Sequence, residues 1–255
     1  MPTKAVRPLS AAAGSGAFIR IVATVIAGCL LAVAPAAWAQ REMVDTALVL
    51  AVDVSGSVTP ERFALQMEGI ARAFEDGLVQ RAVLSGQHRS LFVTLVEWSN
   101  RPALSVPWTL ITDRESARAF AARIREARRA DDQFTCMSAA LQMIAGKVLP
   151  FLPAPSARTI IDVSGDGHDN CNPVKPVDAV RDELVAAGVT INGLPILEGE
   201  EADTLEGWYR DHVIGGQNAF LLPASGFRDF GRAIRAKFVL EISFLARRFL
   251  PRSAN

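Results

Sequence analysis

The sequence predicts an α/β fold, namely a doubly wound, mostly parallel six-stranded sheet with helices on both faces. Two observations support this prediction. Six short apolar runs recur along the chain, most of them without the polar alternation of a half-exposed strand, and such runs are typical of parallel strands buried on both faces. Segments with apolar residues at helical spacing separate most of these runs, which is the alternation of βαβ units.

The first strand is expected at 46–54 and the first helix at 60–79. Thr59 is a suitable N-cap, and Pro60 suits the first helical position. The apolar residues of this helix fall on one stripe: Phe63, Met67, Ile70, Phe74 and Leu78.

The rest of the chain continues the alternation. Residues 103–111 form a weaker strand, which Pro107 confines to an edge of the sheet because proline cannot donate a ladder hydrogen bond. The other strands are expected at 90–98, 158–164, 189–196 and 218–224, and the other helices at 114–129, 137–148, 174–187, 202–212 and 226–249.

Residues 1–39 have the pattern of a secretory signal peptide. Three basic residues without an acidic one precede an apolar run at 21–37, and the small residues Ala-Trp-Ala end at Ala39, where we place the cleavage. This predicts a periplasmic or secreted bacterial protein. Two alternatives are a membrane anchor, which Pro35 would interrupt, and a lipoprotein signal ending at Cys29, which mostly apolar residues follow.

The mature chain, 40–255, has a length that suits one domain. Without the signal it keeps 24 basic and 27 acidic side chains, a formal charge of −3. That charge, and the lack of a basic stripe with interleaved aromatic residues, argue against nucleic acid as a partner. The cluster Arg123, Arg125, Arg128 and Arg129 is expected on a solvated helix face, and no stable membrane span is expected after signal removal.

Polar side chains stand where two predicted strands end. Asp53, Ser55 and Ser57 follow the first strand, and alternate residues of an extended segment share a face. Asp166 follows the strand at 158–164, and Thr135 precedes the helix at 137–148. Carboxylate and hydroxyl oxygens suit Mg²⁺, Mn²⁺ or Ca²⁺. The structural alternative is a capped turn in which Asp53 and Ser55 satisfy helix-end donors.

With Asp-x-Ser-x-Ser at Asp53, Ser55 and Ser57, Thr135 in a later loop and Asp166 in "GDG", the chain resembles the von Willebrand factor A-type domain with its metal-ion-dependent adhesion site. The resemblance covers essentially the whole mature chain and is closest to secreted bacterial stand-alone A-type domains of unknown function. One departure is Phe134, which stands where family members commonly have glycine.

The resemblance implies a division of roles at one divalent ion, with Mg²⁺ as the first choice and Mn²⁺ or Ca²⁺ as alternatives. Ser55, Ser57 and Thr135 would contact the ion directly, and Asp53 and Asp166 would act largely through water. The ion would take a carboxylate, from Asp or Glu of a protein or peptide partner, as its last ligand. If the two loops converge on this ion, Cys136 and Cys171 come close together, and we expect a disulfide between them in an oxidising compartment.

The functional expectation is therefore a secreted, metal-dependent protein-binding module without turnover. The chain contains no G-x-S-x-G elbow, no P-loop and no evident base paired to a nucleophile. A metal-dependent hydrolase or nucleotide-binding enzyme on a doubly wound sheet is the alternative. The sequence leaves open the roles of His168, beside the site, and of Asp162, in the middle of a strand.

Overall fold

The structure is a computed structural model that describes residues 42–129, 133–171 and 175–243, together with Met1 and Thr3. The predicted signal peptide, residues 1–39, and its cleavage site therefore lie outside the described residues, apart from those two. In the described part of the chain, no helix has the length and apolar character needed to cross a membrane.

A five-stranded sheet forms the centre of the fold, with strand order β3-β2-β1-β4-β5. Its strands are β1 (Thr46–Asp53), β2 (Leu91–Trp98), β3 (Ala103–Ile111), β4 (Thr159–Gly165) and β5 (Val189–Pro195). The pairs β1–β2, β1–β4 and β4–β5 are parallel, and β3 is antiparallel to β2 at the edge. The doubly wound α/β prediction is confirmed, as is the edge position of the strand that contains Pro107.

The sheet has five strands, so the prediction of a sixth strand at 218–224 is wrong. In this segment the structure has only isolated bridges, from Leu221 to Gly193 and from Ala224 to Ile196. Pro223 has no N–H to donate to a ladder, and the segment opens at Asn218 with a positive φ of 57°. These residues follow β5 without forming a regular strand.

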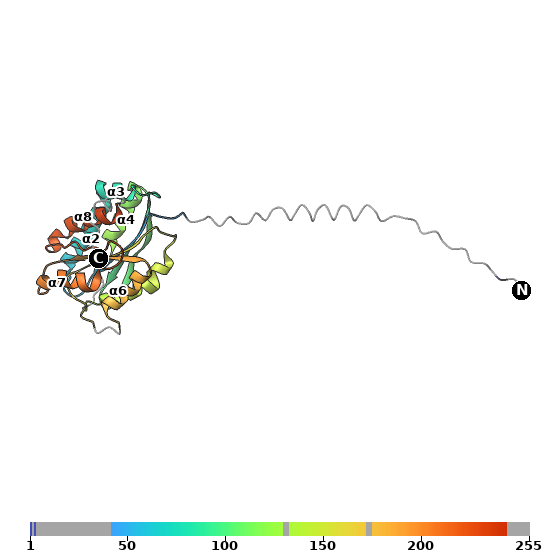
Figure 1. Cartoon of the computed structure of the whole chain (residues 1–255). Helices are drawn as coiled ribbons and strands as arrows, with labels where there is room; N and C mark the ends of the chain where they lie inside the picture. Colours follow the sequence, from blue (N-terminus) through green and yellow to red (C-terminus); the bar gives the residue numbers. More distant parts are fainter. Residues whose placement is uncertain (2, 4–41, 130–132, 172–174, 244–255) are drawn as a thin grey trace. The chain divides into compact units, whose positions relative to one another are not determined.

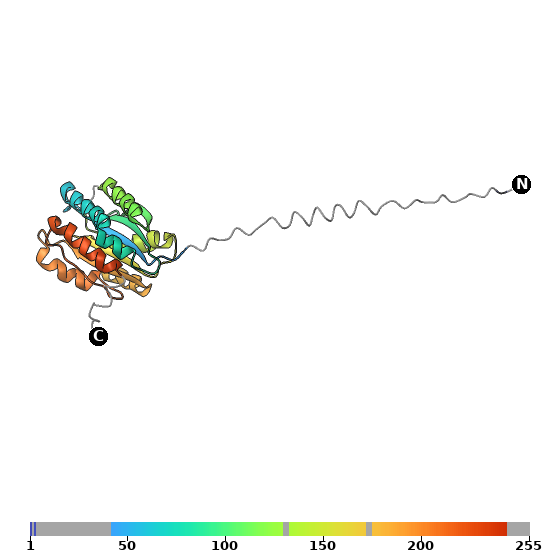
Figure 2. The ribbon, with the colours of Figure 1, turned by 90° about the horizontal axis from the view of Figure 1, so that it is seen from above.

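Helices cover both faces of the sheet (Figure 1). Helices α2 (Pro60–Glu75), α3 (Gly77–Val83), α4 (Arg114–Glu126) and α8 (Phe230–Ile242) pack on one face. Figure 2 shows α4, α2 and α8 side by side on this face. The other face carries α5 (Met137–Met143), the π-helical turn η1 (Ile144–Val148), the short 3-10 turn η2 (Leu149–Phe151), α6 (Val177–Ala186), α7 (Ala202–Trp208) and η3 (Tyr209–Val213).

Several predicted helices have other bounds in the structure, and two of them differ most. The helix predicted at 60–79 divides at Asp76, whose carboxylate accepts hydrogen bonds from the N–H groups of Leu78 and Val79 and so starts α3. The last helix begins at Phe230 after the 3-10 turn η4 (Phe227–Asp229). The part of its prediction beyond Ser243 lies outside the described residues.

The strand order places a switch point between β1 and β4. From β1 the chain first builds β2 and β3 on one side, and it then returns to add β4 and β5 on the other. In open α/β sheets, the crevice at the carboxyl ends of such a strand pair is where ligands bind. Asp53 ends β1 and Asp166 directly follows β4, so the sheet itself brings both carboxylates to this crevice.

The structure also explains the buried Asp162. Its carboxylate lies 2.7 Å from the ammonium group of Lys237 on α8, and both side chains are at least 98% buried. Lys237 also contacts the carboxylate of Glu241 one turn later, and Asn192 on β5 donates a hydrogen bond to Glu241 at 2.8 Å. Buried charges are tolerated when they are paired, and this cluster links α8 to β4 and β5.

Candidate metal site

The loop after β1 holds the first part of the site. Asp53 and Ser55 are fully buried, whereas Ser57 is exposed. The Ser55 N–H donates a hydrogen bond to Asp53 Oδ1 at 2.8 Å, and Val58 N–H donates to the Ser55 carbonyl at 3.0 Å. The buried amide of Gln66 on α2 donates to the Asp53 carbonyl. This tight turn fixes the carboxylate and both serines at the end of the strand.

The loop after β4 meets this turn directly. Ser57 Oγ donates a hydrogen bond to Asp166 Oδ1 at 2.6 Å, and the hydroxyls of Ser55 and Ser57 lie 3.3 Å apart. Four of the five residues predicted from the sequence are thus linked by contacts: Asp53 to Ser55, Ser55 to Ser57, and Ser57 to Asp166.

Thr135, the fifth residue, lies in a third loop that packs against the other two. It is 4% exposed. The Gly56 N–H donates to the carbonyl of Gln133, which holds the third loop to the first. Asn170 accepts a hydrogen bond from the Thr135 N–H and donates its own N–H to the Thr135 carbonyl. A Cβ built on Gly167 would lie 3.7 Å from Thr135 Oγ1, so this hydroxyl faces the loop of Asp166.

The predicted disulfide between Cys136 and Cys171 is present, with the two Cα atoms 5.2 Å apart. It joins the residue after Thr135 to the residue after Asn170. The second and third loops of the site are therefore held together covalently and by hydrogen bonds.

The electrostatics of the site favour a bound cation. Asp53 is fully buried, and its Oδ2 has no hydrogen-bond partner among the described residues. Burial, and then the nearby charge of Asp166, raise the pKa of Asp53 to about 7. Burial likewise raises the pKa of Asp166. Two buried carboxylates, one with an unpaired oxygen, are costly in the ionised form without a positive charge.

The donor set fits a hard divalent ion. It consists of carboxylate and hydroxyl oxygens, the ligands that Mg²⁺, Mn²⁺ and Ca²⁺ prefer. Among the described residues, no group of three or more His, Cys, Asp or Glu side chains could hold a metal ion. An ion here would accordingly depend on two carboxylates and on the neutral hydroxyls of Ser55, Ser57 and Thr135.

Two arginines that were not predicted as site residues contact the site. Arg62 donates to the Ser57 carbonyl at 2.7 Å, lies 3.7 Å from Asp166 Oδ2, and pairs with Glu198 at 2.7 Å. Arg129 donates to the carbonyls of Val58 at 2.7 Å and Ser55 at 3.2 Å. The expectation that Arg129 lies on a solvated helix face is thus wrong, because α4 ends at Glu126 and Arg129 turns back to the site.

His168 contacts α7. Its backbone N–H donates to Glu201 at 2.6 Å, and its ring lies 5.1 Å from the ring of Trp208. Behind the site, Tyr209 Oη is buried and has no hydrogen-bond partner within residues 42–129, 133–171 and 175–243. Burial, followed by the charge of Asp53, raises the pKa of Tyr209. No sequence signal identified Tyr209, because its position depends on how η3 packs on the sheet.

Comparison with known proteins supports the fold. A family model described as "Protein of unknown function (DUF1194)" matches residues 43–246. No curated protein matches the sequence. Among solved structures, proximal thread matrix protein 1 from the mussel byssus is 15% identical with a TM-score of 0.59, over 78% of this chain and 46% of that one. This chain therefore spans less than half the length of that protein.

Further neighbours share the same architecture. A von Willebrand factor type A protein from Catenulispora acidiphila is 16% identical with a TM-score of 0.53, over 78% of this chain and 43% of that one. The vWF domain of the type V pili tip protein Mfa5 from Porphyromonas gingivalis is 10% identical with a TM-score of 0.54, over 79% and 97%. A second mussel structure is described as having a zinc-occupied MIDAS motif, at 16% identity and a TM-score of 0.57 over 77% and 45%. These likenesses show that the chain has the fold of an A-type domain.

Proposed function

The chain belongs to the DUF1194 family, and we propose that it is a secreted, metal-dependent protein-binding module of the adhesion type. Its ion would capture an acidic group, from Asp or Glu, of a protein or peptide partner. The observation that carries the proposal is the junction of the β1 and β4 loops. Here Ser57 donates a hydrogen bond to Asp166, and the buried Asp53 keeps one oxygen without a partner in the part of the chain that the structure describes.

In this proposal Ser55, Ser57 and Thr135 hold the ion directly, and Asp53 and Asp166 orient the serines and bound water. A divalent ion supplies positive charge and coordination positions for oxygen ligands, and Mg²⁺ is our first choice, before Mn²⁺ and Ca²⁺. With few direct anionic ligands, the site would leave the ion attractive to an external carboxylate. The exposed position of Ser57 would give such a partner access from solvent.

The fold neighbours support a binding role. They include a pilus tip protein and a pilus adhesin, SpaC from Lactobacillus rhamnosus GG. For this chain we propose a periplasmic or extracellular location, consistent with the disulfide between Cys136 and Cys171. The partner would then bind at the proposed metal site, at the carboxyl ends of β1 and β4.

Calorimetry tests the metal first. Mg²⁺ should bind the mature chain at one site, and Asp53→Ala should abolish that binding. Asp182→Ala is the control. It removes a 70%-exposed carboxylate of α6, which is not part of the three loops of the site, so this variant should bind Mg²⁺ as the wild type does. Equal binding by wild type and Asp53→Ala would exclude this site.

A pull-down from periplasmic extract then tests partner binding. The partner should be retained with Mg²⁺ and released by chelator, while the circular dichroism of the module is unchanged. Replacing the critical Asp or Glu of the identified partner by its amide should have the same effect as chelator. Retention in the presence of chelator would place the interface elsewhere.

A further inference from the structure

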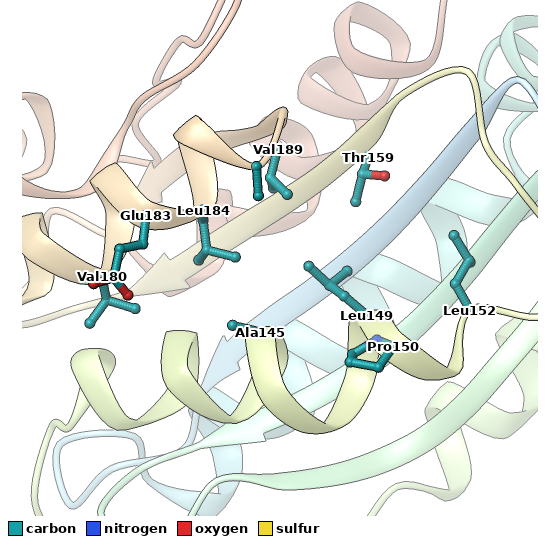
Figure 3. A pocket seen from close by; sticks show the side chains of 10 residues that line it. Ala145, Leu149, Pro150, Leu152, Thr159, Val180, Glu183, Leu184 and Val189 are labelled. Carbon is teal, nitrogen blue, oxygen red and sulfur yellow. The ribbon is translucent and has the colours of Figure 1, made fainter.

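A second candidate binding site lies at the opposite end of the sheet from the metal loops. It is an apolar pocket of about 360 Å³ between η1, η2 and α6, above the first residues of β4 and β5 (Figure 3). Its lining includes Leu149, Leu152, Val180, Leu184, Val189 and Glu183. A pocket with mainly aliphatic walls and one carboxylate suits an apolar segment that also carries positive charge.

Exposed apolar surface continues beyond the lining. Phe151, between the lining residues Pro150 and Leu152, is 73% exposed. Glu183 is 63% exposed, and its carboxylate forms an ion pair with the ammonium group of Lys175 at 2.5 Å.

The last described helix ends at the same end of the sheet as this pocket, on the opposite face. Arg158 donates hydrogen bonds to the carbonyls of Glu241 at 2.9 Å and of Ile242 at 3.1 Å. The next residue after Arg158 is Thr159, which starts β4 and lines the pocket. The chain therefore leaves α8 beside the start of β4, and it needs only to pass around this end of the sheet to reach the pocket.

The twelve residues that follow Ser243 have a sequence that matches this chemistry. Residues 244–255, FLARRFLPRSAN, lie outside the described residues. They contain four large apolar side chains and three arginines: Phe244, Leu245, Phe249 and Leu250, and Arg247, Arg248 and Arg252. From Ser243 to Phe249, an extended chain can reach about 20 Å, which exceeds the length of the arginine side chain that joins α8 to the start of β4.

We propose that this C-terminal segment is the occupant of the pocket. Phe249 and Leu250 insert between η2 and α6, and an arginine of the segment pairs with Glu183. The segment thereby covers the apolar pocket and leaves the proposed metal site accessible. This inference does not depend on metal binding.

Photo-crosslinking tests the proposal in the full mature chain. With p-benzoylphenylalanine at position 249, irradiation at low micromolar concentration should give an intramolecular adduct. Peptide mass spectrometry should locate it at 145–152, at Thr159 or at 180–189, the segments that line the pocket. Adducts elsewhere in the chain, crosslinked dimers that show a second copy as the occupant, or the absence of any adduct would each overturn the proposal.

A charge-reversal pair tests the electrostatic part. Glu183→Lys should lower the adduct yield at least threefold, because it repels the arginines. Glu206→Lys reverses a 39%-exposed carboxylate on α7 and should leave the yield unchanged. Equal yields in both variants would remove the assigned role of Glu183.

Hydrogen exchange gives a readout without the bulky probe. Phe249→Ser in the full chain should raise the exchange rates of amides at 180–187 several-fold, since their apolar cover is lost. Leu78→Ser is the control, because Leu78 is a 48%-exposed residue of α3 on the other face of the sheet. Unchanged exchange at 180–187 in Phe249→Ser would contradict the docking.

Discussion

The hydroxyl of Ser57 donates a hydrogen bond to a carboxylate oxygen of Asp166 at 2.6 Å, across 109 residues of sequence. This contact joins the loops after β1 and β4, the two strands on either side of the switch point. Asp53, the last residue of β1, is buried beneath the same loops. The three side chains define the place where we expect a divalent ion.

The first prediction concerns Ser57. Ser57→Ala removes one proposed ligand and the hydrogen bond to Asp166, so Mg²⁺ affinity should fall by at least tenfold, which corresponds to about 1.4 kcal/mol. Because Ser57 is exposed, the free energy of unfolding measured in chelator should change by less than about 1 kcal/mol. Calorimetry and urea unfolding measure the two effects. Unaltered Mg²⁺ affinity would remove Ser57 from the ligand set.

A second prediction concerns the space beside Asp53. A Cβ on Gly165 would lie 2.8 Å from Asp53 Oδ2 and 3.0 Å from Tyr209 Oη. Gly165→Ala should therefore displace the carboxylate, weaken Mg²⁺ binding at least tenfold and destabilise the fold by about 1–3 kcal/mol through overpacking.

The matched control is Gly207→Ala, since a Cβ on Gly207 in α7 meets no atom within 4 Å. Alanine is also the better helix former there. Calorimetry and urea unfolding should therefore show wild-type Mg²⁺ affinity and equal or greater stability for this control. The same loss in both alanine variants would contradict the role assigned to Gly165.

The disulfide gives the third prediction. Cys136 and Cys171 close a loop of 35 residues, so replacing both by serine should lower the free energy of unfolding by about 3–4 kcal/mol in the chain-entropy model. Metal affinity should also fall, because Thr135 and Asp166 would no longer be held together before the ion binds. Urea unfolding and Mg²⁺ titration of the double variant, compared with the oxidised wild type, measure these losses. Wild-type affinity in the double variant would show that the bridge serves stability alone.

Much of the fold follows from local patterns in the sequence. The apolar runs identified all five strands, because strands buried on both faces need apolar residues at nearly every position. The break at Asp76 was not predicted, because the apolar stripe of the sequence continues to Leu78. Leu78 is in fact 48% exposed. Its partial burial therefore stabilises a continued helix less than the N-cap of Asp76 stabilises a new one.

The proximity of the candidate residues was predictable where it depends on strand ends. Asp53, Ser55, Ser57 and Asp166 could be placed together because parallel strands end at one edge. Arg62, Arg129 and Tyr209 could not, because their contacts depend on helix and loop packing that no local spacing encodes. For the same reason, Asp162 could not be assigned its partner Lys237, 75 residues later.

The fourth prediction concerns Arg129, which binds the carbonyls of Ser55 and Val58. Arg129→Met keeps much of the apolar stem but leaves these carbonyls without their charged donor, so stability should fall by about 1–3 kcal/mol. Mg²⁺ affinity should fall as well, because the loop after β1 loses the hydrogen bonds from Arg129 that hold it in place. Arg128→Met is the control, as Arg128 is the exposed neighbour. Similar losses of stability and affinity in both variants would point to a general effect of lost positive charge.

The fifth prediction concerns pH and the buried Glu241. Burial, and then the charge of Asp162, raise the pKa of Glu241 from 4.5 to about 8, although Lys237 acts in the opposite direction. The folded state therefore keeps this proton up to about pH 8, whereas the unfolded chain releases it near pH 4.5. The stability contributed by the protonated form is fully present below pH 4.5 and is lost as the pH rises to 8.

Glu241→Gln mimics the protonated side chain and can still accept the hydrogen bond from Asn192. Between pH 5 and 8, the free energy of unfolding should therefore fall less in this variant than in the wild type, by about 1–4 kcal/mol. Urea unfolding in chelator at several pH values measures the difference, and chelator keeps metal binding from contributing. Asp182→Asn, at a 70%-exposed position, should follow the wild-type curve. Parallel curves for Glu241→Gln and wild type would show that Glu241 is ionised in the fold, with Lys237 balancing its charge.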